Sequence, residues 1–199
     1  MTYEYENLLK EKGYNFVCGV DEAGRGPLAG PVFAAAVILP DGLEEIGIND
    51  SKKLSEKKRA ALFELIKEKA VAYSVGSASE KEIDEINILN ATFLAMKRAV
   101  DGLSIKPDIA LIDGNRKPNT GIEEITLVKG DAKSISIAAA SILAKVSRDE
   151  YMKDLDKKYP EYQFAKHKGY PTKLHYELIK KYGISPVHRL SFLKNLSEK

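Results

Sequence analysis

The chain has 199 residues, of which 44% are hydrophobic and 30% are charged, and 31 basic against 29 acidic side chains leave a net charge of +2. A chain of this length holds about one domain and buries roughly 70% of its unfolded surface, so a core forms without covalent staples. Cys18 is the single cysteine, which excludes an intrachain disulfide and a four-thiolate metal site and favours a reducing, cytoplasmic location.

The first half of the chain predicts three strands and two helices. Residues 16–20 and 32–39 are short apolar runs joined by a glycine-rich turn, which favours an antiparallel hairpin. Ser55 is placed to cap a helix whose apolar residues recur at helical spacing. Residues 71–77 form the next strand-like run, and residues 87–100 the next helical pattern.

The second half predicts two more strands and a helical end. Residues 109–112 and 125–128 are the next strand-like runs. The strand-like runs that come after the hairpin, from residue 71 on, alternate with helical patterns, which favours parallel crossovers. Helical patterns cover residues 132–159, before Pro160, and residues 172–182, before Gly183. We therefore predict an α/β fold with a mixed five-stranded sheet flanked by helices on both faces. Residues 1–199 form one domain, in which a wholly helical segment from about residue 160 is a packed C-terminal appendage.

Acidic side chains stand at the ends of three predicted strands. Asp21 and Glu22 end the first, Asp113 ends the fourth, and Asp131 follows the fifth. Burying an unpaired carboxylate is costly, and ligands of sheet-based α/β folds bind just beyond strand ends. Oxygen ligands without a cysteine or histidine cluster favour Mg²⁺ or Mn²⁺. The pattern predicts two divalent ions that hold a phosphodiester for attack by water.

Other readings of the same residues stay open. Asp113 before Gly114 is, by itself, typical of a turn. Paired acids also serve glycosidases, although the chain has no tryptophan to stack on sugars. The glycines of residues 23–30 resemble a dinucleotide-binding fingerprint only superficially, because a strand and not a helix follows them. Arg25 within them offers a planar fork to phosphate, and a plain hairpin turn is the alternative.

Local charge is more informative than the net charge. Residues 49–69 carry a net charge of +3 and residues 157–181 a net charge of +5. If the fold joins these two segments, they form one basic surface for nucleic acid. The alternative for each segment is a solvated helix face.

Six sequence blocks, in this order, closely resemble those of the bacterial ribonuclease HII family, the type 2 ribonucleases H. The blocks are VDEAGRGPLAGPV at 20–32, DSKKLS at 50–55, LIDGN at 111–115, KGDAKSISIAAASILAKVSRD at 129–149, HKGYPT at 167–172 and HRLSF at 188–192. The resemblance implies a ribonuclease H-like fold with metal-binding carboxylates at Asp21, Glu22, Asp113 and Asp131. By that analogy Asp21 bridges both ions and Asp131 lies beside the ion that activates water. Glu22 and Asp113 lie beside the ion that stabilises the leaving 3′ oxygen.

The resemblance also implies the substrate. It predicts hydrolysis of the RNA strand of RNA/DNA hybrids, and nicking of duplex DNA 5′ to embedded ribonucleotides, with 3′-hydroxyl and 5′-phosphate ends, in replication and repair. Gly24, Arg25 and Gly26 would read the 2′-hydroxyl, and the Tyr170 ring would pack on the next sugar. A half-buried structural tyrosine is the alternative for Tyr170. Predicted phosphate contacts are Ser51, Lys52, Lys53, Lys145, Arg148 and Lys168.

The remaining polar residues receive structural roles. His167, His175 and His188 are too scattered to predict a metal cluster, so surface or helix-packing positions are expected. Asp149 is expected to pair with a nearby base. No apolar run approaches the roughly 20 residues of a membrane helix, residues 1–16 lack a signal-peptide stretch, and no heptad seam is present, so we expect a monomer outside membranes. Rival functions are a noncatalytic nucleic-acid-binding module and a nuclease for another substrate, such as a Holliday junction.

Overall fold

The computed structural model describes residues 3–43, 47, 48 and 54–194, and a mixed five-stranded sheet lies at its centre. The strands are β1 (Val17–Ala23), β2 (Val32–Ile38), β3 (Ala72–Ala78), β4 (Ile109–Asp113) and β5 (Glu123–Leu127). Their order across the sheet is β3-β2-β1-β4-β5. Each predicted strand is therefore present. β5 starts two residues earlier than expected, and it ends one residue earlier, before exposed Val128.

Strand directions confirm the mixed sheet and correct one detail. β1 pairs antiparallel with β2, as the hairpin prediction requires, and β4 pairs parallel with β1 and with β5. β3 follows a helix, which predicted a parallel partner, but it pairs antiparallel with β2. The reason is that the intervening helix returns the chain to the end of β2 that it left, where the Val71 amide donates to the Ile38 carbonyl at 2.9 Å, so β3 runs back along β2.

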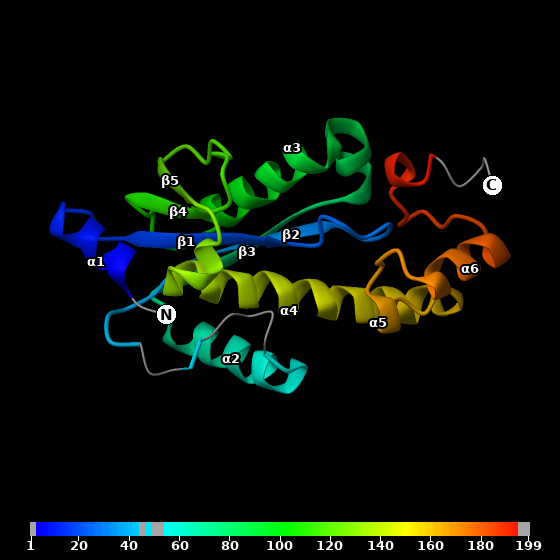
Figure 1. Cartoon of the computed structure of the whole chain (residues 1–199), viewed down its shortest axis with the longest axis horizontal. Helices are drawn as coiled ribbons and strands as arrows, with labels where there is room; N and C mark the ends of the chain where they lie inside the picture. Colours follow the sequence, from blue (N-terminus) through cyan, green and yellow to red (C-terminus); the bar gives the residue numbers. More distant parts are fainter. Residues whose placement is uncertain (1–2, 44–46, 49–53, 195–199) are drawn as a thin grey trace.

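The helices cover both faces of the sheet (Figure 1). On one face α3 (Glu80–Asp101) packs on β1, β2 and β3. On the other, α4 (Ile135–Lys158) packs on β1 and β2, and α2 (Glu56–Lys69) packs on α4. The Ser55 cap of α2 is confirmed, since its side chain accepts a hydrogen bond from the Lys58 amide. Sequence reasoning missed α1 (Glu4–Glu11), which precedes β1.

α3 begins earlier than predicted because it consists of two helical segments. Ser79 and Glu82 form a reciprocal cap at its true start. Asn87, the predicted start, has a φ of 66° and kinks the helix, and its side chain accepts hydrogen bonds from the Leu89 and Asn90 amides. The sequence pattern therefore located the second segment and missed the first.

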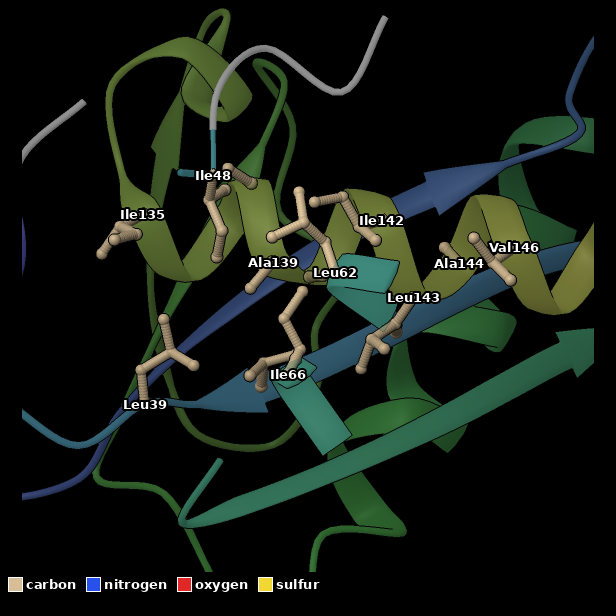
Figure 2. Packing of buried hydrophobic residues seen from close by; sticks show 14 of the residues in the cluster. Leu39, Ile48, Leu62, Ile66, Ile135, Ala139, Ile142, Leu143, Ala144 and Val146 are labelled. Carbon is tan, nitrogen blue, oxygen red and sulfur yellow. The ribbon is translucent and has the colours of Figure 1, made fainter. Parts of the chain in front are cut away.

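The core on the α4 face explains why this helix can be almost wholly apolar along its first half. Figure 2 shows Leu62 and Ile66 of α2 packed toward Ile142 and Leu143 of α4. α4 is clamped between α2 and the sheet, so most of its side chains are buried. A Cβ on Gly19 of β1 would overlap the backbone of α4, so glycine there permits the close contact of strand and helix.

The C-terminal segment packs on the far half of α4. It contains η4 (Pro160–Tyr162), α5 (Phe164–His167), α6 (Lys173–Tyr182) and η5 (Leu190–Phe192). Met152 and Leu155 of α4 form a cluster with Tyr162, Phe164 and Leu178. The segment is not wholly helical as predicted, because His188 forms an isolated antiparallel bridge with Ala29. Within the described residues, no helix is long and apolar enough to cross a membrane.

Candidate active site

Sheet register brings three of the predicted acids together. The parallel pairing of Val20 with Ile112 places Asp21 beside Asp113, one residue further along each strand. Asp21 lies within β1 and Asp113 is the last residue of β4. Because side chains alternate along a strand, Asp21 and Glu22 point to opposite faces of the sheet. Asp21 accepts a hydrogen bond from Ser141 of α4, whereas Glu22 lines a cavity on the α3 side.

Asp131 reaches the same end of the sheet through a tight turn after β5. It lies in η3 (Gly130–Ala132), directly before α4, and is 5% exposed. The Gly130 amide donates a 2.6 Å hydrogen bond to Asp113 Oδ1, which ties the turn to the end of β4. Lys129, which precedes the turn, has a left-handed φ of 56°. The neighbour of Asp131 in the chain is therefore bonded to one of the other acids.

The charges of the grouped acids oppose one another. Burial raises the pKa of Asp21 well above its ordinary range, and the negative charges of Glu22 and Asp113 raise it further. Burial also raises the pKa of Glu22, against the opposing effect of Arg25, whose guanidinium lies 3.2 Å from Glu22 Oε1. Asp21 Oδ1 accepts one further bond, of 2.7 Å, from the Glu22 amide. Such a cluster of negative charge is stabilised by a bound cation.

The donor chemistry fits hard divalent ions, although the metal-binding geometry is not preformed. In the part of the chain that the structure describes, no three His, Cys, Asp or Glu side chains are arranged to hold an ion as they stand. Asp113 is engaged by Gly130, and Glu22 by Arg25. The site nevertheless offers buried carboxylate oxygens whose mutual repulsion an ion would relieve. The set fits magnesium or manganese by chemistry and charge.

A cavity of about 360 Å³ opens beside these acids. Glu22, Arg25 and Asp113 line it on one side, and the loop after β4 and the kinked half of α3 line the rest: Gly114, Asn115, Arg116, Leu89, Thr92, Phe93 and Met96. Carboxylates and arginines around one opening suit a ligand that brings both phosphate groups and metal ions. Asn115 ends the LIDGN block but was given no role from the sequence, and Arg116 follows that block without a spacing signal of its own.

The family assignment rests on most of the chain. Residues 18–195 match the family model described as Ribonuclease HII. The chain belongs to the ribonuclease HII family. It is 58% identical over 194 residues to the ribonuclease HII of Caldicellulosiruptor bescii, covering 98% of this chain and 94% of that protein. It is also 58% identical to the ribonuclease HII of Vibrio parahaemolyticus, covering 91% and 86%.

Solved structures agree with this ribonuclease HII fold. The ribonuclease H2 of Pyrococcus horikoshii superposes with a TM-score of 0.75 at 32% identity, covering 88% of this chain and 93% of that one. The chain is thus a type 2 ribonuclease H, an endonuclease that hydrolyses the RNA strand of RNA/DNA hybrids. The predicted fold and family are confirmed, and the roles of individual site residues stay predictions.

The glycine-rich turn and Tyr170 lie side by side in this ribonuclease HII, although 144 positions separate Gly26 from Tyr170 in the sequence. A Cβ built on Gly26 would lie 3.8 Å from the Tyr170 ring. Tyr170 is 39% exposed, so its ring is available to a ligand. The structure therefore brings together the two elements predicted to read the ribose and its neighbouring sugar.

The predicted phosphate contacts divide into three groups. Lys145 lies 5.9 Å from the Tyr170 ring centroid and pairs with Asp149 at 2.7 Å, as expected for that acid. Lys168 precedes Gly169 and donates to the Ala165 carbonyl. Arg148 is 0% exposed and bonds backbone carbonyls, so its prediction as a phosphate contact is wrong, because a buried guanidinium cannot face solvent-borne phosphate. Ser51, Lys52 and Lys53 lie outside the described residues.

The three histidines are neither scattered nor on the surface, which corrects that part of the prediction. The His167 and His175 rings stack with centroids 4.2 Å apart, and His175 Nε2 lies 3.1 Å from His188 Nε2. All three are buried, and burial lowers the pKa of His175 and of His188 to about 4. Their backbone partners include Tyr170 and Gly169, so they pack beneath the Tyr170 segment. The helix-packing alternative is thus the correct one.

Proposed function

We propose that this ribonuclease HII uses two divalent ions to nick duplex DNA 5′ to an embedded ribonucleotide, as well as to cut RNA in hybrids. The observation that supports it most is the acid cluster of buried Asp21 with half-buried Glu22 and Asp113, and with buried Asp131 in the adjoining turn. When bound, the ions supply a low-pKa water as nucleophile and neutralise charge on the phosphoryl oxygens. Asp21 would hold both ions, Asp131 would hold the ion that activates water, and Glu22 and Asp113 would hold the ion that stabilises the leaving oxygen.

The residues of the chain prepare these acids for that task. The Ser141 bond and the Glu22 amide hold the Asp21 carboxylate in place. Arg25 opposes the effect of burial on the pKa of Glu22 and lies in the same cavity lining, where its guanidinium can meet a phosphate. The bond from Gly130 to Asp113 fixes the η3 turn that carries Asp131. These contacts restrain the acid side chains near one another, although the described residues do not form the ligand geometry as they stand.

Ribose recognition is assigned to the neighbouring turn and ring. Gly24, Arg25 and Gly26 let the backbone approach a 2′-hydroxyl closely, since two of them lack a Cβ. The exposed Tyr170 ring, against Gly26, packs on the sugar that follows and favours one without a 2′-hydroxyl. Lys145 and Lys168, near this ring or the residues before it, are proposed to contact phosphates of the strand.

The two basic segments support one extended nucleic-acid surface. Lys153 of α4 pairs with Glu56 of α2 at 3.1 Å, and both Lys153 and Lys168 lower the pKa of the Glu56 carboxylate. The start of α2 thus lies in the electrostatic field of the C-terminal basic segment. Because phosphate contacts supply most sequence-independent affinity, a joined basic surface suits a duplex ligand.

The deciding experiment compares duplexes with one ribonucleotide, with an all-RNA strand and with DNA only, in Mg²⁺, Mn²⁺ or a chelator. We expect nicking on the 5′ side of the ribonucleotide, 3′-hydroxyl and 5′-phosphate ends, and no cleavage of DNA or in chelator. A 2′,3′-cyclic phosphate product would refute water as the nucleophile. Binding without any cleavage would support the noncatalytic alternative. If a Holliday junction, added as a fourth substrate, were cleaved in preference to the duplexes, the protein would instead be a nuclease for that substrate.

A further inference from the structure

Two buried arginines lie beneath the glycine-rich turn and need an explanation. Arg148 comes from α4 and Arg189 from the residue before η5, and both are 0% exposed. Burial lowers the pKa of both guanidinium groups, that of Arg189 to about 9. Glu80 at the start of α3 supplies a nearby negative charge to both. Buried charges are expensive, so the bonds they make identify what they are for.

Arg148 bonds two separate segments of the predicted ribose-reading site. Its Nε donates to the Pro31 carbonyl at 3.3 Å, and its Nη2 donates to the Ala29 carbonyl at 3.3 Å. The same Nη2 donates to the Lys168 carbonyl at 3.0 Å, two residues before Tyr170. A Cβ on Gly24 would overlap the Arg148 side chain, so the turn is shaped to this guanidinium.

Arg189 holds the other side of the same turn. Its Nη2 donates to the Gly24 carbonyl at 2.7 Å, its Nη1 to the Arg25 carbonyl at 3.1 Å, and its Nε to the Gly30 carbonyl at 2.8 Å. All of these acceptors are backbone atoms of residues 24–30. Arg189 therefore fixes the path of the turn itself, whereas Arg148 connects the turn to the Tyr170 segment.

Further contacts make the turn and Tyr170 one unit. The Leu28 amide donates to the Gly169 carbonyl at 2.8 Å. The Arg148 guanidinium lies 5.6 Å from the Tyr170 ring centroid, within cation–π range. Arg148 also lies seven residues, about two helical turns, beyond Ser141, which bonds the Asp21 carboxylate. One rigid helix thus links the acids to the reading elements.

We propose that Arg148 is a positioning residue that determines specificity for ribonucleotide–deoxyribonucleotide junctions, with Arg189 as its partner on the turn. The inference rests on the proposed function and deepens it. One ribose and the sugar after it must meet the turn and the Tyr170 ring at the same time. Misplacement by about 1 Å is enough to lose much of a reaction rate, so the spacing between the two elements has to be held.

The test measures junction preference, defined as kcat/KM for a duplex with one ribonucleotide divided by kcat/KM for an all-RNA hybrid. We expect Arg148→Lys and Arg148→Gln to lower this ratio about tenfold, toward that of Tyr170→Ala. Adding Arg148→Lys to Tyr170→Ala should lower it little further, since both changes remove one interaction. A purely structural role would reduce both kcat/KM values in proportion and leave the ratio unchanged.

Arg98→Lys is the matched control, because Arg98 also donates to a backbone carbonyl, that of Ser77, while its partner carboxylate is Glu82. Its ratio should equal that of the wild type. Circular dichroism establishes which variants are folded, and Arg189→Lys carries the same test if the Arg148 variants unfold. A folded Arg148 or Arg189 variant with the wild-type ratio overturns the inference. Unfolding of every Arg148 and Arg189 variant also overturns it, because the arginines would then contribute stability and not specificity. A wild type that fails to nick the junction refutes the proposed function instead.

Discussion

The acid cluster and the ribose-reading region are built by different physical means. At the acid cluster, backbone pairing positions the side chains. Adjacent parallel strands bring Asp21 beside Asp113, and a hydrogen bond from the Gly130 amide to Asp113 connects the turn that carries Asp131. At the reading region, side chains do the positioning, because the buried Arg148 and Arg189 bond backbone carbonyls of irregular segments. In the proposed function, the sheet therefore positions the metal-binding acids, and a separate set of buried polar contacts positions the residues proposed to select the substrate.

The largest expected effect is at the sheet-built end. Asp21→Asn should reduce cleavage by more than about 100-fold, beyond the loss typical of residues that only support a ligand. Affinity for the duplex should remain, because the basic surface is untouched. Cleavage rates and duplex binding are measured side by side, with Asp154→Asn, an exposed acid paired with Lys157, as the control that keeps activity. Turnover of the Asp21 variant in Mg²⁺ would contradict its bridging role.

The next prediction concerns the loss of folding stability when the buried histidines beneath Tyr170 become protonated. His175 Nδ1 lies 3.0 Å from the Tyr170 carbonyl and therefore donates, so its Nε2 accepts from His188 Nε2. His188 Nδ1 in turn accepts from the Ser185 amide. A further proton would have to bind His175 Nε2 or His188 Nδ1, and each of these nitrogens already faces an N–H donor. This agrees with the lowered pKa of about 4 for both rings.

The sign of the pH effect follows from these pKa values. Both lie below the ordinary histidine value of 6.5, so the unfolded chain binds more protons and stability falls as pH falls from about 6.5 to about 4. The difference between pKa values of 6.5 and about 4 corresponds to a loss of roughly 3 kcal/mol for each ring. Thermal melts across this range measure the loss, and NMR titration of the ring protons separates it from that of carboxylates. Ring pKa values near 6.5 in the folded protein would contradict it.

Tyr170→Ala sharpens the comparison with a smaller effect. Removing the ring should lower junction preference about tenfold, or about 1.4 kcal/mol, while hydrolysis of the all-RNA hybrid continues. Tyr170→Phe should retain the preference because it keeps the ring. Tyr176→Ala removes a ring of nearly equal exposure, 38% against 39%, and serves as the matched control. Equal losses on both substrates would show that the ring supports the fold and does not discriminate between sugars.

The two regions also differ in how far sequence predicts them. A strand that ends in an acid is a local pattern, and the parallel pairing of β1 with β4 joins two such strand ends, so the cluster of Asp21, Glu22 and Asp113 could be predicted. Arg148 could not, because its burial depends on segments far away in the chain. The prediction that the histidines are scattered was wrong for the same reason, since α6 brings His175 against His188 and His167 only in the folded chain. Asn87 gave a false helix start because it caps a second segment.

The smallest effect concerns the phosphate contacts. Lys145 is 30% exposed in its side chain and lies near Tyr170, so Lys145→Gln should weaken duplex binding about threefold and reduce the slope of log affinity against log salt by about 1. Junction preference should stay unchanged, because a phosphate contact is the same for both substrates. Lys106→Gln is the control with an unaltered slope, because Lys106 is exposed, precedes β4 and lies outside both basic segments. A salt slope that does not respond to Lys145→Gln would mean that this lysine serves Asp149 alone and that phosphate recognition near Tyr170 belongs to other residues.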